Sequence, residues 1–306
     1  MKYLCGLLCV FTFSYTFSND YVINSFDNHS IHGTLLESAK SNSVLSIIIS
    51  GSGPTDRDGN NTSLKSDYLK MLAEGLFENG ISSYRYDKRG VGNSIGNIQS
   101  GNDIKFIDYI NDVVSIINHF KDIKEYKQIV VIGHSEGALI GMIASRLIAD
   151  SFISISGAGE DYLTLIQRQL SIQPPYVKSM SDPIIEKLKN KELVDSVPPL
   201  LNSLFNKTVQ KYLIDASSFD PKDEISKLDI PVLIVQGSND IQIEIKDAQL
   251  LHNAAKKSRI EIIQGMNHVF RQAPDNRLLN MQTYGNPELS IDDSLVNLIV
   301  DFLDEN

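Results

Sequence analysis

The sequence predicts an α/β protein: a mostly parallel sheet with helices on both faces and an inserted helical cap. Short apolar segments alternate with longer segments whose apolar residues recur at helical spacing, which is typical of strand–helix–strand units. This alternation stops at about residue 158, and helical patterns broken by prolines continue to about residue 226. Helices inserted there are expected to cover the carboxyl ends of the strands, where ligands of open α/β sheets bind.

The first half of the chain supplies its elements in a regular order. Residues 21–26 and 31–37 predict an antiparallel hairpin that turns at Asp27-Asn28-His29. Residues 44–50 form a continuous apolar run, as expected for a strand that is buried on both faces. Helices are then expected at 66–79, 104–120 and 135–149, and further strands at 81–86, 128–132 and 152–156.

The α/β pattern returns after the cap. Strands are expected at 231–236 and 259–263, and helices at 243–255 and 291–303. The sequence therefore predicts one α/β domain at residues 19–306, with a cap insertion at about 158–226.

The first 18 residues differ from the rest. Lys2 precedes a largely apolar run at 3–17, and small residues around Ser18 suit cleavage before Asn19, as in a secretory signal peptide. An uncleaved anchor is the alternative, but the run is short for a membrane span. We therefore expect a secreted or periplasmic protein with no stable membrane insertion after cleavage. Both cysteines, Cys5 and Cys9, lie in this segment, so the mature domain would need no disulfide or cysteine metal site.

Charge narrows the classes of partner. The formal net charge is −10, from 28 basic and 38 acidic residues, and the lysines are scattered among acidic residues. Nucleic acid is therefore not an expected partner, because phosphate binding depends on clustered positive charge. The expected partner is a small-molecule substrate, and the sequence does not predict the oligomeric state.

The segment Gly133-His134-Ser135-Glu136-Gly137 carries the clearest chemical signal. A G-x-S-x-G pattern arises by chance about 0.1 times in a chain of this length. Here it follows an apolar strand at 129–132 and opens a helix at 138–143, which is the setting of a nucleophile elbow. Ser135 is thus the predicted nucleophile. The alternative is an ordinary strand-to-helix turn in which Ser135 caps the helix.

In this context the chain resembles the α/β-hydrolase superfamily, and the resemblance covers nearly all of the mature sequence. Residues 86–94 are similar to the D-x-R-G-x-G-x-S segment of that superfamily. Residues 51–60 resemble a loop of bacterial carboxylesterases that are close to the lysophospholipase-like and S33 serine-peptidase-like hydrolases. The resemblance implies the α/β-hydrolase fold and a serine hydrolase that uses neither metal nor organic cofactor.

A serine hydroxyl needs a base and an acid, and this fold orders them as serine, acid, histidine along the chain. Only His252 and His268 lie far enough downstream, and His252 falls inside a helical pattern. His268 is therefore the predicted base. Asp240, in the loop after the 231–236 strand, is the predicted acid, with Asp247 as the fallback that we expect to face solvent.

The oxyanion needs two backbone N–H donors. Glu136, directly after the nucleophile, supplies the first, and its side chain is expected to face solvent. By resemblance Ser52 supplies the second, with Gly53 as the other choice. The nearby charged cluster at 56–58 is expected to be an ion-paired scaffold that pairs with Arg85, Lys88 or Arg89 rather than a substrate contact.

The cap is rich in apolar and aromatic residues, and some of them are expected to line an apolar pocket. Such a pocket favours hydrolysis of carboxylic esters with a small acyl or aryl group. An S33-like aminopeptidase is the alternative, with Glu160, Asp161 or Asp215 available to hold a substrate amine. A thioesterase is less favoured, because the sequence offers no cationic cluster for an acyl-CoA. A catalytically silent binding protein is the remaining alternative.

Overall fold

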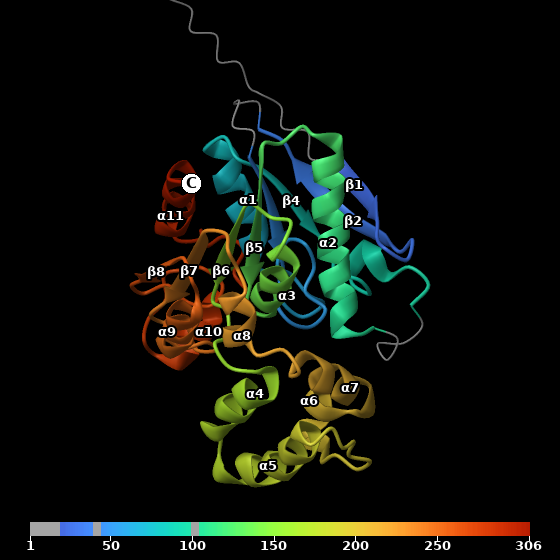
Figure 1. The fold of residues 1–306 in the computed structure, drawn as a ribbon. Helices are drawn as coiled ribbons and strands as arrows, with labels where there is room; N and C mark the ends of the chain where they lie inside the picture. The colour runs from blue at the N-terminus through green and yellow to red at the C-terminus, as the bar shows by residue number, and fades with distance from the viewer. Residues whose placement is uncertain (1–18, 39–43, 99–103) are drawn as a thin grey trace, which may run out of the picture.

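The computed structural model describes residues 19–38, 44–98 and 104–306, so the expected signal segment lies outside the described residues. Its centre is an eight-stranded sheet in the order β1-β2-β4-β3-β5-β6-β7-β8 (Figure 1). β1 and β2 form an antiparallel hairpin at one edge, and the strands from β4 to β8 are parallel. The strands are β1 (Asn19–Asn24), β2 (Ser30–Leu36), β3 (Val44–Ile49), β4 (Ser82–Tyr86), β5 (Gln128–His134), β6 (Ser151–Ile155), β7 (Val232–Gly237) and β8 (Ser258–Ile263).

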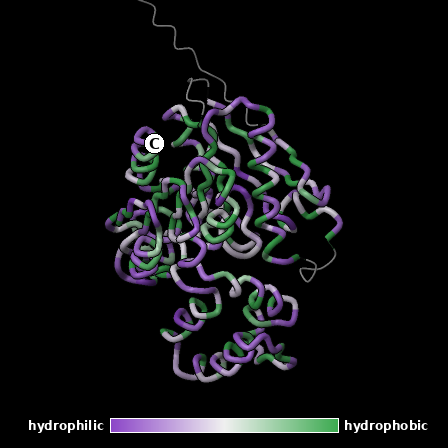
Figure 2. Tube along the Cα trace, viewed as in Figure 1, coloured by the Kyte–Doolittle hydropathy of each residue, from purple (hydrophilic) through white to green (hydrophobic). Residues whose placement is uncertain are grey.

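Helices cover both faces of the sheet because the central strands are apolar on both sides. In β5, Ile129 and Val131 join one core cluster, whereas Val130 and Ile132 join the other. Hydrophobic segments accordingly gather on the central strands (Figure 2). The first cluster is covered by α2 (Phe106–Ile123), α3 (Glu136–Ser145), α8 (Pro221–Ser226) and α9 (Ile245–Ala254), and the second by α1 (Tyr68–Glu78) and α11 (Asp293–Asp304).

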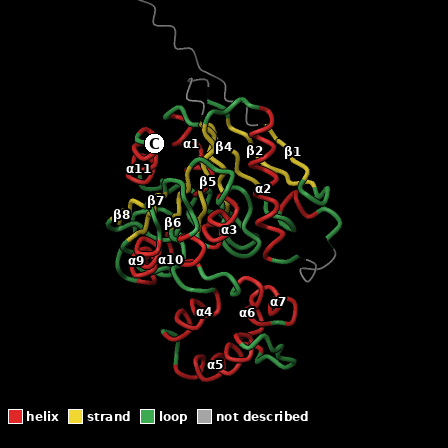
Figure 3. Tube along the Cα trace, in the orientation of Figure 1, coloured by secondary structure: helices red, strands yellow, loops and turns green. Residues whose placement is uncertain are grey.

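The chain segment between β6 and β7 forms a helical unit that lies apart from the sheet (Figure 3). It has its own apolar cluster, which includes Leu163, Ile185, Phe205 and Leu213. We call this unit the cap. Its elements are α4 (Tyr162–Ser171), α5 (Pro175–Lys189), the 3-10 turn η3 (Pro199–Leu201), α6 (Asn202–Phe205) and α7 (Lys207–Ala216). The next helix, α8, packs instead on α3 and α9 of the body.

One α-helix in the described part of the chain was not expected from the sequence. α10 (Arg277–Thr283) follows β8, and the Asn276 side chain caps it by accepting the N–H groups of Leu278 and Leu279. Its apolar side chains Leu278, Leu279 and Met281 are exposed, so it has no inward apolar face for a periodicity argument to detect. None of the helices in the described part of the chain is both long and apolar enough to cross a membrane.

Candidate active site

Ser135 stands between the last residue of β5 and the first residue of α3. Its φ of 55° and ψ of −119° are rare for a residue with a side chain, and such strain is concentrated at functional sites. A Cβ at Gly133 would lie 2.3 Å from the Gly137 carbonyl oxygen, so the tight turn excludes a side chain there. The Ser135 hydroxyl makes no capping bond within the described helix α3, which removes the main support for the capping alternative.

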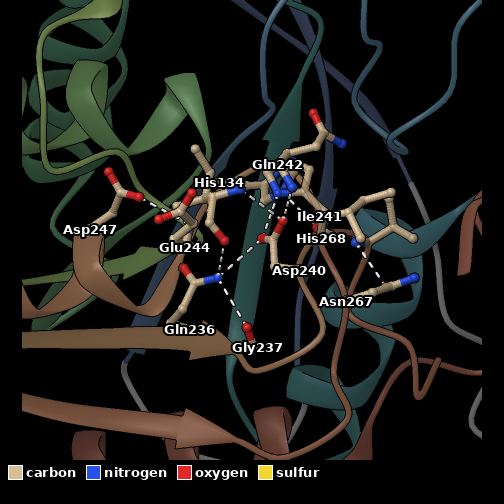
Figure 4. A network of polar contacts seen from close by, with 12 residues as sticks. His134, Gln236, Gly237, Asp240, Ile241, Gln242, Glu244, Asp247, Asn267 and His268 are labelled. Atoms are coloured by element: carbon tan, nitrogen blue, oxygen red, sulfur yellow. Dashed lines mark hydrogen bonds and ion pairs between the residues drawn. The ribbon is translucent and has the colours of Figure 1, made fainter. Parts of the chain in front are cut away.

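His268 and Asp240 meet at the same edge of the sheet, in the loops after β8 and β7 (Figure 4). The His268 Nδ1–H group donates to Asp240 Oδ2 at 2.7 Å, which leaves Nε2 as the proton acceptor of the imidazole. The Asp240 side chain is fully buried and also accepts the backbone N–H groups of Gln242 and Ile243 at 2.8 and 3.0 Å. Burial alone would raise the pKa of Asp240, but His268 and the two N–H groups outweigh it and lower the pKa below its usual value.

His134, next to the nucleophile, holds the His268 loop from the other side. Its ring lies 4.6 Å from the His268 ring between centroids, and its Nε2 lies 2.9 Å from the His268 carbonyl oxygen. Because a carbonyl only accepts, Nε2 carries the proton, and Nδ1 accepts from the Tyr68 hydroxyl at 2.9 Å. Burial, with His268 nearby, lowers the pKa of His134 well below its usual value. The sequence did not indicate this role for His134, because the G-x-S-x-G motif leaves that position open.

Ser135, Glu136 and Ser52 line a cavity of about 570 Å³ between the body and the cap. Its other walls are largely apolar and include Leu139, Leu165, Val209, Leu213 and Ile243. The loop that carries Ser52 passes close to the nucleophile, because a Cβ at Gly51 would lie 3.3 Å from Ser135 Cβ. Glu136 is the first residue of α3, so no carbonyl of the same helix is available to accept its backbone N–H. The two expected donors therefore border the same space as Ser135.

The Glu136 side chain corrects one expectation. It does not face solvent: its exposed fraction is 2%, and Oε1 lies 3.1 Å from Lys88 Nζ. Its Oε2 accepts the Tyr162 hydroxyl at 2.8 Å. Pairing explains the burial, because an unpaired carboxylate in this position would be costly. The sequence placed Glu136 at a helix start but gave no sign of its two partners, which come from a distant loop and from the cap.

The charged loop at 56–58 is a scaffold, as expected. Arg85 Nε lies 2.7 Å from Asp58 Oδ1, and Arg57 Nη2 lies 2.8 Å from Asp87 Oδ2. Asp56 accepts the backbone N–H groups of Asp58 and Asn60 at 2.9 and 2.8 Å. These bonds close the loop on itself and on the end of β4, which fixes the path of the chain just after Ser52.

Asp247 corrects a second expectation. It is fully buried, and its two oxygens bind Arg168 Nη2 at 2.7 Å, so it does not face solvent. Asp247 Oδ1 also accepts the backbone N–H of Gly159 at 3.0 Å. Arg168 lies on α4, so Asp247 anchors the cap to α9 of the body. The other excluded candidate, His252, bonds through Nδ1 to the Ser258 hydroxyl at 2.8 Å.

The unexpected helix α10 braces the two loops that carry Asp240 and His268. Asn280 donates to the carbonyl of Asn239 at 2.8 Å and accepts from Asn267 Nδ2 at 3.1 Å. Within the described residues, no group of three or more histidine, cysteine, aspartate or glutamate side chains is placed to hold a metal ion.

The sequence of this chain is similar to a known protein family and to a protein named as an esterase. The family model of the S33 serine aminopeptidases matches residues 64–158. The esterase EstD of Thermotoga maritima is 28% identical over 234 residues, which is 73% of this chain and 53% of EstD, so the chain spans about half the length of that relative.

Two solved structures share the fold over most of their length. Est1E from Butyrivibrio proteoclasticus, solved with bound ferulic acid, has a TM-score of 0.62 at 19% identity and covers 93% of this chain and 98% of its own. The Pyrococcus furiosus esterase Pf2001 has a TM-score of 0.62 at 16% identity and covers 95% of this chain and 91% of its own.

Proposed function

We propose that this chain, an α/β-hydrolase, is a serine esterase that cleaves carboxylic esters with small acyl or aryl groups. The observation that carries the proposal is the buried Asp240–His268 hydrogen bond at the carboxyl ends of the strands. The strained Ser135 turn lies at the same end of the sheet and borders the cavity. The esterase named as a relative and the esterases among the similar structures support the same reaction class.

The mechanism is two-step acyl transfer. His268 Nε2 accepts the Ser135 proton as the hydroxyl oxygen attacks the ester carbonyl, and Asp240 stabilises the imidazolium. The Ser52 and Glu136 N–H groups bind the oxyanion, and His268 then protonates the leaving alcohol. In the second step His268 activates water, which releases the acid from Ser135.

The state of the nearby carboxylates favours an ester over a peptide amine as the substrate. Glu160 pairs with Arg168 at 3.4 Å and with Lys246 at 3.2 Å. Asp161 caps α4, and Asp215 accepts the N–H of Phe106 at 2.8 Å. Each acid that was available to hold a substrate ammonium therefore already has a partner.

The amino-terminal segment also leads to a proposal. We infer that residues 1–18 direct the chain out of the cytoplasm and are removed before Asn19. Mass spectrometry of the protein recovered from its own host would test this, and a mature chain that still begins at Met1 would contradict it.

The reaction is tested with p-nitrophenyl esters of graded acyl length, and Ser135→Ala is expected to lower kcat by at least about 10⁴-fold. A fluorophosphonate probe should label wild type at Ser135 and leave the folded variant unlabelled. Equal turnover of wild type and Ser135→Ala would refute the proposal. Faster release of an amino-terminal residue from aminoacyl-anilides than of acid from esters would favour the aminopeptidase instead.

A further inference from the structure

A closed chain of side-chain bonds joins the two backbone amides that the proposed reaction uses. Lys88 Nζ donates to the Gly51 carbonyl and lies 3.1 Å from Glu136 Oε1. The Tyr162 hydroxyl donates to Glu136 Oε2 at 2.8 Å and lies 3.0 Å from Ser52 Oγ. Because Gly51 and Ser52 are consecutive, the chain of bonds closes on itself. We call this set of residues the clamp.

The bond from Lys88 acts on the oxyanion donor itself. The Gly51 carbonyl and the Ser52 N–H belong to one planar peptide group, so fixing the oxygen also fixes the direction of the N–H. A cation on the carbonyl oxygen draws electron density away from the nitrogen and strengthens that N–H as a donor. The counter-ion of Lys88 is Glu136, whose own N–H is the second donor.

The cost of burying this ion pair points to a role beyond stability. The side chains of Lys88 and Glu136 are 1% and 2% exposed. Buried ion pairs commonly stabilise a fold no better than apolar residues of similar size would. The position of this pair, between the nucleophile and the oxyanion loop, is better explained by the alignment of the Ser52 N–H group.

Tyr162 connects the clamp to the cap. Its single hydroxyl proton goes to Glu136, the acceptor-only partner, so the Ser52 hydroxyl donates to the Tyr162 oxygen. Tyr162 is the first residue of α4, and its hydroxyl therefore closes the clamp only when the cap is seated on the body.

We propose that Lys88 is a positioning residue of the oxyanion hole, which orients and polarises the Gly51–Ser52 peptide with Glu136 as its counter-ion and Tyr162 as its link to the cap. The inference rests on the proposed function. It assigns to Lys88 and Tyr162 an effect on the transition state rather than on substrate binding.

The clamp is tested by removing the ion pair as a unit. Lys88→Met alone would leave Glu136 buried without its cation, so the double variant Lys88→Met/Glu136→Gln is the main test. We expect kcat to fall roughly 10²-fold, the lower end of the loss when an oxyanion donor is removed, with KM changed less than about threefold. Tyr162→Phe, which keeps the ring, is expected to lower kcat about tenfold in the same way.

The control variants remove groups of the same kind at the surface, away from the clamp. Lys256→Met deletes a surface lysine paired with Asp229, and Tyr126→Phe deletes a hydroxyl that bonds to Glu37. Both are expected to keep the wild-type kcat. Circular dichroism and thermal unfolding establish that every variant is folded at the assay temperature.

A trifluoromethyl ketone separates positioning from a general structural role, because its adduct with Ser135 places an oxyanion in the hole. Its inhibition constant should rise in proportion to the loss in kcat/KM, while inhibition by the product alcohol, which places no oxyanion in the hole, should stay the same. A folded double variant with wild-type kcat, or one that loses kcat without weaker ketone inhibition, would overturn the clamp alone. A wild-type protein that neither hydrolyses esters nor labels at Ser135 would overturn the proposed function, and the clamp with it.

Discussion

At the scale of single residues, the site depends on which atom carries each proton. His268 donates through Nδ1 to Asp240, and His134 donates through Nε2 to the His268 carbonyl. The two imidazoles, 4.6 Å apart between ring centroids, are therefore held in opposite tautomers. His268 accepts and returns a proton through Nε2 in the proposed reaction, whereas His134 must stay neutral, because a proton on its Nδ1 would displace the bond from Tyr68.

His134 predicts how stability depends on pH. Its folded-state pKa lies well below that of an unfolded histidine, about 6.5, so the unfolded chain binds an additional proton in acid. This contribution to the free energy of unfolding is complete above about pH 6.5 and falls by up to about 2 kcal/mol at pH 5.

Urea unfolding between pH 5 and pH 8 measures this effect. His134→Gln, which can still donate to the His268 carbonyl and does not titrate, should lose the corresponding part of the pH dependence. His252→Gln serves as the control, because His252 is half-buried on α9 away from the site. Identical pH profiles for wild type and His134→Gln would contradict the assignment.

How much the sequence predicts also differs among residues. Ser135 and Asp240 could be proposed because each follows a strand that its apolar run identifies, and His268 because it follows the last expected strand and lies downstream of both. The side chains of Glu136 and Asp247 were placed wrongly, since their partners Lys88 and Arg168 are remote in the chain. Local periodicity carries no information about such tertiary pairs.

At the scale of elements, the sequence predicts the central strands but not the small helix α10. The central strands β5 and β7 contain continuous apolar runs, which a single sequence identifies well. α10 is held by polar contacts that reach the catalytic loops, among them the Asn280 bonds to Asn239 and Asn267 and the Arg277 bond to the Ile241 carbonyl. Its signal was a single capping residue, Asn276, which is not enough to predict a helix.

The first turn of α9 lies close to the acid loop, so Asp240 and Asp247 can be tested as alternatives. Asp240→Asn is expected to lower kcat by about 10⁴-fold, because an amide can no longer fix the reactive tautomer of His268. Asp247→Asn should leave kcat within about threefold and lower the free energy of unfolding by about 2 kcal/mol, since it weakens the bond from Arg168 and the helix-capping bond from the Glu244 N–H but leaves Asp240 and His268 in place.

Steady-state kinetics and urea unfolding of the two variants give both numbers. The pair is matched, because each variant replaces one fully buried carboxylate by its amide. A larger loss of kcat in Asp247→Asn than in Asp240→Asn would reverse the assignment of the acid.

At the scale of the whole molecule, two units with separate apolar cores enclose the cavity. The cap reaches the body through Tyr162 and Arg168 on α4 and through Asp215 on α7, which accepts the N–H of Phe106. Through Tyr162, α4 is the part of the cap that bonds to the residue next to the nucleophile, whereas α5 packs within the cap on α4 and α7. Substrate selection should therefore depend on the surface that α4 and α7 present to Ser135.

The charges around that cavity predict selection for uncharged esters. Among the described residues that line it, those with charged side chains are Arg89, Glu136 and Glu160. Glu136 pairs with Lys88 and Glu160 with Arg168, and Arg89 pairs with Asp112 at 2.6 Å. A charged acyl group would lose its hydration without gaining a partner.

Esters whose acyl chains end in an ammonium or a carboxylate should therefore have kcat/KM at least about tenfold below that of a methyl-ended ester of equal length, a penalty of about 1.4 kcal/mol. The measurement is kcat/KM for a series of p-nitrophenyl esters matched in chain length. A preference for the ammonium-ended ester would contradict a cavity in which every charged side chain is already paired, and would favour the aminopeptidase.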